Sequence, residues 1–322
     1  MRNPTRILGA LGVVLAASVS LTACDTSPFA AKVDSAVITQ SSVNDQLNGY
    51  ASNKAWVASV DFQNTVAQGG NGATVEGSGG PGTFDSAFSA HVLTEMIIAS
   101  AIQQHLAATG NQPETDTQVA ARAYREASEV TWTSFPASLR QSMSDELAEE
   151  SALVPVPASS STLQKAYEQY QPYLFYRVCL QEASAFTADQ ARTLAGSGSF
   201  TGAQLCYDQA GLETQGTALF RSVVKLSPGD VSAPIKTSYG YEVVKLVSRA
   251  GPALTPGVAR VLGVVTGTAN PAELQKVVAG ASVKVNPAYG TWSSTNFAVL
   301  PPSYTSPSTT PSSPGGQSSS GQ

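Results

Sequence analysis

The residue types that most often carry catalysis are few in this chain. It has two His and three Cys. His91 and His105 stand in a segment of helical pattern, and two His exclude a His-rich metal site. No Ser lies in a G-x-S-x-G elbow. A literal G-x-G-x-x-G at Gly77, Gly79 and Gly82 has no strand before it and is interrupted by Pro, which argues against nucleotide binding.

The first Cys follows an export signal. Arg2 and Arg6 flank the start of an apolar run over 7–20, and residues 21–24 read Leu-Thr-Ala-Cys. A basic start, a short apolar stretch and small residues before a cut site are typical of a secretory signal. The last four residues resemble the lipobox of bacterial lipoproteins, which implies cleavage after residue 23 and a lipid on Cys24. An ordinary signal peptide with a chance Cys is the alternative.

Lipidation would place the mature protein on the outer face of a bacterial cell membrane, anchored by lipid and not by a helix. A signal peptide at 1–23 and a tether at 24–31 are then expected. Charged residues make up only 13%, and removing Arg2 and Arg6 changes the formal charge from −5 to −7. An acidic chain argues against nucleic acid as a partner.

The other two thiols stand as a pair if Cys24 carries lipid. An exported compartment permits disulfides, so we hypothesise a Cys179–Cys206 bridge. Two buried thiols are the alternative.

The elements before residue 171 are mainly helical. A small strand or hairpin at 33–38 is followed by a helix that Thr39 or Ser41 can cap. A Gly-rich loop covers 68–83. Apolar residues then recur at helical spacing from Phe84, a pattern that Gly110 ends. Further helices are predicted from 115, capped by Thr115 or Asp116, in one or two pieces over 135–154, and over 160–174.

After residue 174 the pattern changes to short strands and helices. Strands are predicted at 174–183, 203–209, 228–237 and 239–249, with helices at 187–198 and 216–226. The order β-α-β-α-β-β predicts a small α+β domain at 171–250, with helices against one sheet.

Two stretches resemble known families. Residues 226–246, "LSPGDVSAPIKTSYGYEVVKL", are similar to the last two strands of parvulin-type peptidyl-prolyl isomerases; the matching residues are Leu226, Gly229, Ser232, Pro234, Thr237, Gly240, Val243, Val244 and Lys245. The hairpin and helix start "KVDSAVITQSSVNDQL" resembles the chaperone module of SurA/PrsA-type proteins. The resemblance implies an α+β fold: a helical SurA-N-like domain at 32–170 with an inserted parvulin-like (PpiC-type) domain at 171–250.

The departures from that family concern its catalytic residues. Arg177 and Glu242 stand where the resemblance places the two catalytic His, and the segment before "AQLCYD" is shortened. This implies a domain that keeps the fold without the isomerase chemistry. On neighbouring strands, Arg177 and Glu242 could form a salt bridge; two independent solvated charges are the alternative. The resemblance also places Cys179 and Cys206 on neighbouring strands.

The carboxyl-terminal part is expected to return to the helical domain. The sequence loosens after residue 250, and 270–292 then give a short helix and a strand. We predict that 281–290 pairs with 31–38, so that 251–299 completes the helical domain. Residues 300–322 have almost nothing to bury and are expected to be disordered.

These observations favour an exported, lipid-anchored chaperone or foldase-like protein that binds unfolded or translocated polypeptides and has no isomerase activity. No cofactor and no metal is expected. The candidate peptide-binding residues are Tyr207, Leu219, Phe220 and Tyr239, each of which could equally belong to the core. The alternatives are an active prolyl isomerase, using Glu242, Tyr207 or Cys206, and a non-catalytic scaffold for an envelope partner.

Overall fold

The computed structural model describes residues 29–67, 74–80 and 82–302, with the side chains of 63–67 excepted. The expected lipidation at Cys24, the signal peptide and nearly all of the expected tail lie outside the described residues, as does part of the Gly-rich loop. Within them, no helix combines the length and the apolar character needed to cross a membrane.

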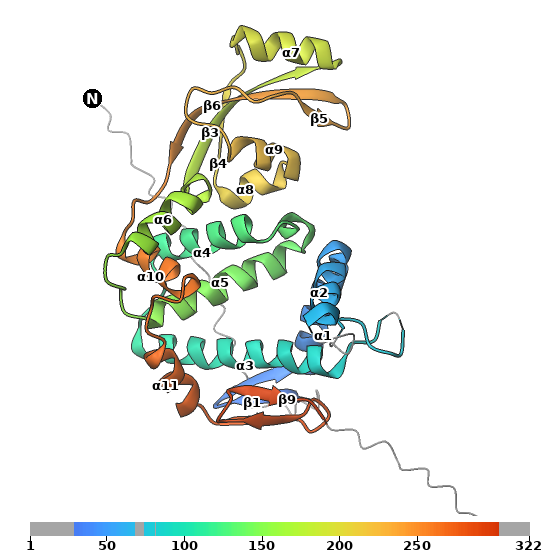
Figure 1. Ribbon diagram of the computed structural model, residues 1–322, viewed down its shortest axis with the longest axis vertical. Coiled ribbons are helices and arrows are strands. Elements are labelled where there is room, and N and C mark those ends of the chain that lie inside the picture. The colour runs from blue at the N-terminus through green and yellow to red at the C-terminus, as the bar shows by residue number, and fades with distance from the viewer. Residues whose placement is uncertain (1–28, 68–73, 81, 303–322) are drawn as a thin grey trace, which may run out of the picture.

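A three-stranded sheet joins the two ends of the described chain (Figure 1). Its order is β2-β1-β7, formed by β2 (Ala36–Thr39), β1 (Phe29–Val33) and β7 (Val283–Val285). β7 pairs antiparallel with β1, which confirms the predicted return of 281–290 to 31–38. A hairpin of β8 (Thr291–Ser293) and β9 (Ala298–Leu300) follows, so regular structure extends to the first residue of the expected tail.

The helices lie between this sheet and a second, four-stranded sheet (Figure 1). They are α1 (Gln40–Ser52), α2 (Lys54–Ala67), α3 (Ser86–Thr109), α4 (Thr115–Ser128), α5 (Ala137–Leu153) and α6 (Ser161–Tyr170), with short 3-10 turns at Trp132–Ser134 and Gln171–Tyr173. Thr39 caps α1 as predicted, and Gly110 ends α3 in the left-handed conformation. The expected cap of α4 is wrong: Glu114 is the N-cap residue, without a side-chain bond.

The expected loosening after residue 250 is also wrong. α10 (Pro256–Val265) begins six residues after the second sheet ends, capped by Thr255, and buries Val258, Val261 and Leu262 against α4 and α5. Pro256 at its first turn supplies a preset φ without losing a needed hydrogen bond. α11 (Ala272–Gly280) then packs on α3.

The second sheet is antiparallel, in the order β4-β3-β6-β5. Its strands are β4 (Gln204–Tyr207), β3 (Arg177–Ala185), β6 (Gly240–Ala250) and β5 (Ile235–Thr237). α7 (Ala188–Ser197) lies on one face, and α8 (Gln209–Thr214) and α9 (Thr217–Val223) lie on the other (Figure 1). The predicted order β-α-β-α-β-β lacks α8, which the structure has between β4 and α9. Of the strand predicted at 228–237, only the last three residues form a regular strand, β5.

A β-bulge interrupts the long pairing of β3 with β6. Cys179 pairs with Ser248, but Leu180 pairs with Leu246, so Val247 is an extra residue on β6. Side chains alternate between the two faces of a strand, and an extra residue reverses that alternation beyond it.

Candidate functional site

The two positions expected to replace a catalytic His pair do not lie side by side. Arg177 pairs with Ala250, and Glu242 pairs with Ser184, at the other end of the β3–β6 ladder. Seven residues of strand separate these positions, which corresponds to about 23 Å. The predicted Arg177–Glu242 salt bridge is therefore wrong, because in an antiparallel pair the start of one strand lies beside the end of the other.

Glu242 instead lies close to a second carboxyl group on β3. On the face that carries Leu180, the next side chain along β3 is Glu182, whose backbone is opposite Val244. Burial raises the pKa of Glu242, and the charge of Glu182 and a carboxyl–carboxyl hydrogen bond with it raise that pKa further. Such a bond needs one proton between the two carboxyl groups.

A tyrosine completes this cluster, which we call the sheet acid pair: Glu182 and Glu242 with Tyr207. The Tyr207 hydroxyl donates to Oε1 of Glu182 over 3.2 Å. Burial raises the pKa of Tyr207, and the charge of Glu182 adds to the effect. None of the ion pairs among the described residues includes either carboxyl. The cluster can thus exchange a proton, accept hydrogen bonds from an amide, or bind a cation.

Two exposed aromatic side chains lie at the same end of the sheet. Phe186 follows β3 and is 87% exposed, and Tyr239 precedes β6 and is 91% exposed. Gly240 has a φ of 138°, and a Cβ there would come within 3.3 Å of the Cα of Phe186, so the β5–β6 turn lies against Phe186. Apolar surface of this kind, next to two carboxyls, can bind another chain.

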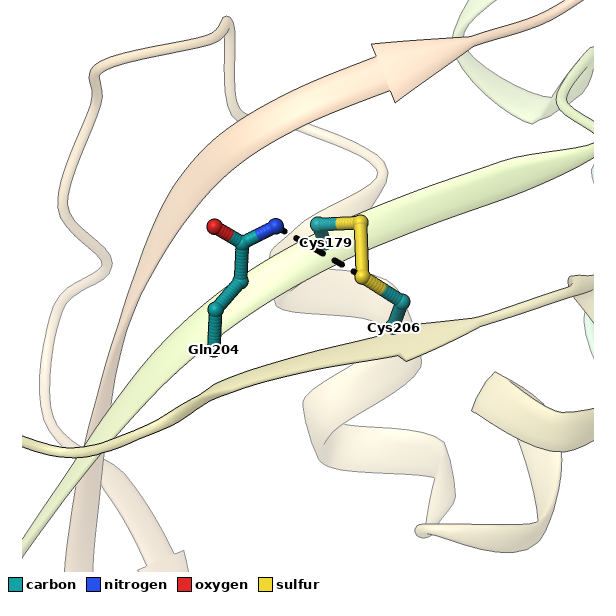
Figure 2. Close-up of a disulfide and its surroundings, with 3 residues drawn as sticks. All are labelled: Cys179, Gln204 and Cys206. Carbon is teal, nitrogen blue, oxygen red and sulfur yellow. Dashed lines mark hydrogen bonds between the residues drawn. A yellow bond between two sulfur atoms is a disulfide. The ribbon is translucent and has the colours of Figure 1, made fainter. Parts of the chain in front are cut away.

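The remaining predicted residues have clear positions. Leu219 and Phe220 are 5% and 3% exposed in the core beneath the sheet, so the core alternative holds for both. The Cys179–Cys206 disulfide is confirmed, across paired positions of β3 and β4. Figure 2 shows this bridge, with the Gln204 side-chain amide 3.6 Å from the sulfur of Cys206. It ties the strand of Tyr207 to the strand of Glu182.

Glu182 is the residue that sequence reasoning missed. Its signal was the alternation with Leu180, which puts it on the face of Val244 and Glu242 once the antiparallel register is known. Register is a long-range property, and the sequence pattern alone did not supply it.

A second carboxyl pair, Glu126 of α4 and Glu213 of α8, is buried where the helical part of the chain meets the helices that cover the second sheet. We call it the junction acid pair. Both side chains are 0% exposed. Arg122 donates to Glu126 over 3.0 Å and to Glu213 over 2.7 Å, and the Trp132 indole donates to Glu213 over 3.1 Å. Nε of Arg140 lies 3.1 Å from Glu213 without hydrogen-bond alignment.

The two junction acids differ in pKa. Burial raises the pKa of Glu126 well above its usual value, and the hydrogen bond with Glu213 and the charge of Glu213 raise it further. Burial opposes ionisation of Glu213 too, but the hydrogen bond from Glu126 and the charges of Arg122 and Arg140 lower its pKa. One proton therefore stays on Glu126 while Glu213 is ionised.

Within the described residues, no cluster of three or more His, Cys, Asp and Glu side chains could hold a metal ion.

No protein-family model and no curated protein matches this chain. Among solved structures it is similar to one from the work on PEB4 and Cj1289, two SurA-like chaperones of Campylobacter jejuni, at 11% identity, covering 81% of this chain and 99% of that one, with a TM-score of 0.22. The foldase PrsA of Lactococcus lactis matches at 14% identity over 81% and 96%, with a TM-score of 0.26. PrsA of Bacillus subtilis matches at 12% over 78% and 90%, with a TM-score of 0.21.

The architecture itself is α+β, with helices between small antiparallel sheets. In these comparisons the chain is similar to SurA-like chaperones and PrsA-type foldases.

Proposed function

We propose that this protein is an exported, lipid-anchored chaperone or foldase-like protein that binds unfolded or translocated polypeptides without isomerising prolyl bonds. One observation carries the proposal: the sheet acid pair, which forms no ion pair with any described residue, lies at the same end of the sheet as Phe186 and Tyr239, which are almost fully exposed.

These groups match what an unfolded chain presents. Apolar side chains of the client contact the two rings, and its Lys or Arg side chains approach the carboxyls. Backbone amides of the client can donate to the same oxygens. Each contact is weak alone, so binding tolerates many client sequences.

The proposed lack of isomerase chemistry is supported by the residues at the site. Rotation about a prolyl bond has a barrier of about 18–20 kcal/mol, which a site lowers by binding the twisted form more tightly than the planar form. The positions that the family resemblance assigns to two His hold Arg177 and Glu242, and these lie at opposite ends of the β3–β6 pairing.

Two assays on the full-length protein test the proposal. We expect suppression of aggregation of a chemically unfolded model protein, reduced by Phe186→Ser with Tyr239→Ser, and the spontaneous rate of isomerisation of a chromogenic proline peptide. Lys165→Ser, a change at an exposed α6 residue, is the matched control. Full suppression by the double variant would contradict the proposed surface.

The lipid anchor has its own test. Metabolic labelling with an alkyne fatty acid should tag the wild-type chain and leave Cys24→Ala untagged. Equal labelling of both would contradict the lipidation of Cys24.

A second candidate, an active prolyl isomerase, is favoured by the hydrogen-bonded cluster of Glu182, Glu242 and Tyr207. A carboxyl pair that shares a proton can donate to the amide nitrogen of a twisted prolyl bond. Acceleration of the peptide assay that is lost in Glu242→Ala would establish this candidate and overturn the first.

A further inference from the structure

A cavity of about 650 Å³ lies where three chain segments meet at the junction of the helices and the second sheet. Its walls come from residues 171–174, from the segment after α9, and from the last residues of β6 and those that follow. This volume falls within the range of small-molecule and peptide pockets.

The charged residues that line this cavity are both cations, Lys225 and Arg249, although the chain as a whole carries a net charge of −5. Lys225 is exposed, and no ion pair of the described residues includes either one. A neighbouring acid, Asp230, accepts a hydrogen bond from the backbone of Ser227 at the rim and is not among the lining residues.

Arg249 is held in place by contacts that do not use all of its N–H groups. One terminal nitrogen donates to the Val223 carbonyl over 2.8 Å, and the guanidinium centre lies 6.0 Å from the ring centroid of Phe175. Its buried Nε–H has no acceptor. A fixed guanidinium without a carboxylate partner is suited to an incoming carboxylate.

Tyrosine and proline rings form part of the other walls. Tyr167 and Tyr173 line the cavity together with Pro172, Pro228 and Pro252. The Tyr167 hydroxyl donates to the Pro252 carbonyl over 3.2 Å, which fixes one side. Aromatic and proline walls contact side chains and backbone of an extended peptide, whereas a small free anion would leave them unused.

The bulge at Val247 puts Arg249 of this cavity on the same face of the sheet as the sheet acid pair. Seven positions separate Glu242 from Arg249, and strict alternation would put them on opposite faces. The extra residue restores them to one face, where Arg249 contacts α9. Their partners on β3, Val178 and Ser184, are six positions apart, so about 20 Å of strand separates Glu242 from the cationic cavity.

We propose that this junction cavity is a second polypeptide-binding site, which takes an extended segment through an acidic Asp or Glu side chain placed between Lys225 and Arg249. The inference extends the proposed polypeptide binding to a site of opposite charge. The two can fail separately, because the sheet acid pair is tested with basic peptides through Glu242 and this cavity with acidic peptides through Lys225.

The test uses fluorescein-labelled peptides and fluorescence anisotropy with the full-length protein in mild detergent. One amidated peptide contains Tyr, Pro and two Glu; a second has Gln in place of both Glu; a third is the Gln peptide with a free terminal carboxylate. We expect the Glu peptide to bind at least about threefold more tightly than the Gln peptide. Raised salt should reduce that difference.

Substitutions test which residues produce the preference for the Glu peptide. Lys225→Gln, an exposed change that leaves the fold intact, should abolish the preference for the Glu peptide, and Lys236→Gln on exposed β5 is the matched control that should keep it. Arg249→Gln, checked by circular dichroism, should act like Lys225→Gln. Equal binding of Glu and Gln peptides, or equal behaviour of Lys225→Gln and Lys236→Gln, would overturn the proposal. Tight binding of the third peptide alone, or of anionic lipid vesicles in place of peptide, would overturn it too.

Discussion

The sheet acid pair and the junction acid pair are built from the same side chains in opposite surroundings. Glu126 and Glu213 are fully buried and contact two arginines and an indole N–H, which come from the helical part of the chain. Glu182 and Glu242 are half-buried, and Glu182 accepts a hydrogen bond from the hydroxyl of Tyr207. A carboxyl pair stabilises a junction when the protein supplies its partners, and it is available to a ligand when the protein does not.

The largest expected effect is on the junction acid pair. Glu213→Ala removes the carboxylate that Arg122, Arg140 and Trp132 contact, and so leaves the two largely buried arginines without the carboxylate that they share. We expect a loss of about 3–5 kcal/mol in the free energy of unfolding. Urea unfolding measures this, with the exposed Glu273→Ala as the control. Equal urea midpoints for Glu213→Ala and Glu273→Ala would contradict the claim that the buried carboxylate stabilises the junction more than an exposed one does.

The next effect concerns the strand that carries Tyr207. The Cys179–Cys206 bridge spans 27 residues, and a closed loop of this length stabilises a protein by about 3 kcal/mol. A Cys179→Ala with Cys206→Ala double variant should unfold at correspondingly lower urea concentration. It should also release β4, seen as faster amide exchange at Tyr207. Unchanged exchange would mean that the bridge does not hold the tyrosine at the sheet acid pair.

The pH dependence of stability should separate the two acids of the junction. The folded protein raises the pKa of Glu126 from 4.5, so the stability that Glu126 contributes is complete below about 4.5 and is lost as pH rises towards the folded pKa. Glu126→Gln keeps the neutral form at every pH. Its urea midpoint should therefore gain on the wild type as pH rises above about 4.5. Parallel curves for the two proteins would contradict the shared proton.

Glu213 acts in the opposite sense, and this provides the control. Its folded pKa is lowered, so its contribution is present above about 4.5 and is lost as pH falls through the folded pKa. Acid destabilisation should therefore persist in Glu126→Gln.

The smallest expected effect is at the sheet acid pair. Glu242→Lys should weaken binding of a Lys-rich labelled peptide by about two- to fivefold, because an exposed ion pair contributes about 0.2–1 kcal/mol. Stability should change little. Lys236→Glu on β5 is the matched reversal of charge and should not weaken binding. Equal binding by Glu242→Lys and wild type would leave the carboxyls without a role in peptide recognition.

Local features of the chain were predictable because their causes lie within a few residues. The cap at Thr39, the left-handed Gly110 and the apolar period of α3 follow from side chains next to the backbone they satisfy. The return of 281–290 to 31–38 and the Cys179–Cys206 bridge were predictable for another reason. The β-branched residues of 281–290 need a neighbouring strand to pair with, and Cys179 and Cys206 are the two Cys that remain if Cys24 carries lipid.

Apart from the cap of α4, the wrong predictions depend on register or on burial. Arg177 was matched to Glu242 by motif position, but antiparallel pairing puts Ala250 beside it. Leu219 and Phe220 were peptide-binding candidates that could equally belong to the core, and their burial beneath the sheet decides for the core. α10 was missed although Thr255 and Pro256 mark its start, and its stability comes from packing on α4 and α5.

The amino-acid sequence by itself determined the cap at Thr39, the class of elements and the scarcity of catalytic side chains. Tertiary structure alone decided which acids meet. Glu182 reaches Glu242 through strand register, Glu213 reaches Arg122 from 91 residues away, and Arg249 shares a face with Glu242 because Val247 is an extra residue. Contacts at such separations depend on how whole strands and helices pack, and their energies are fixed only when burial removes water from the charges.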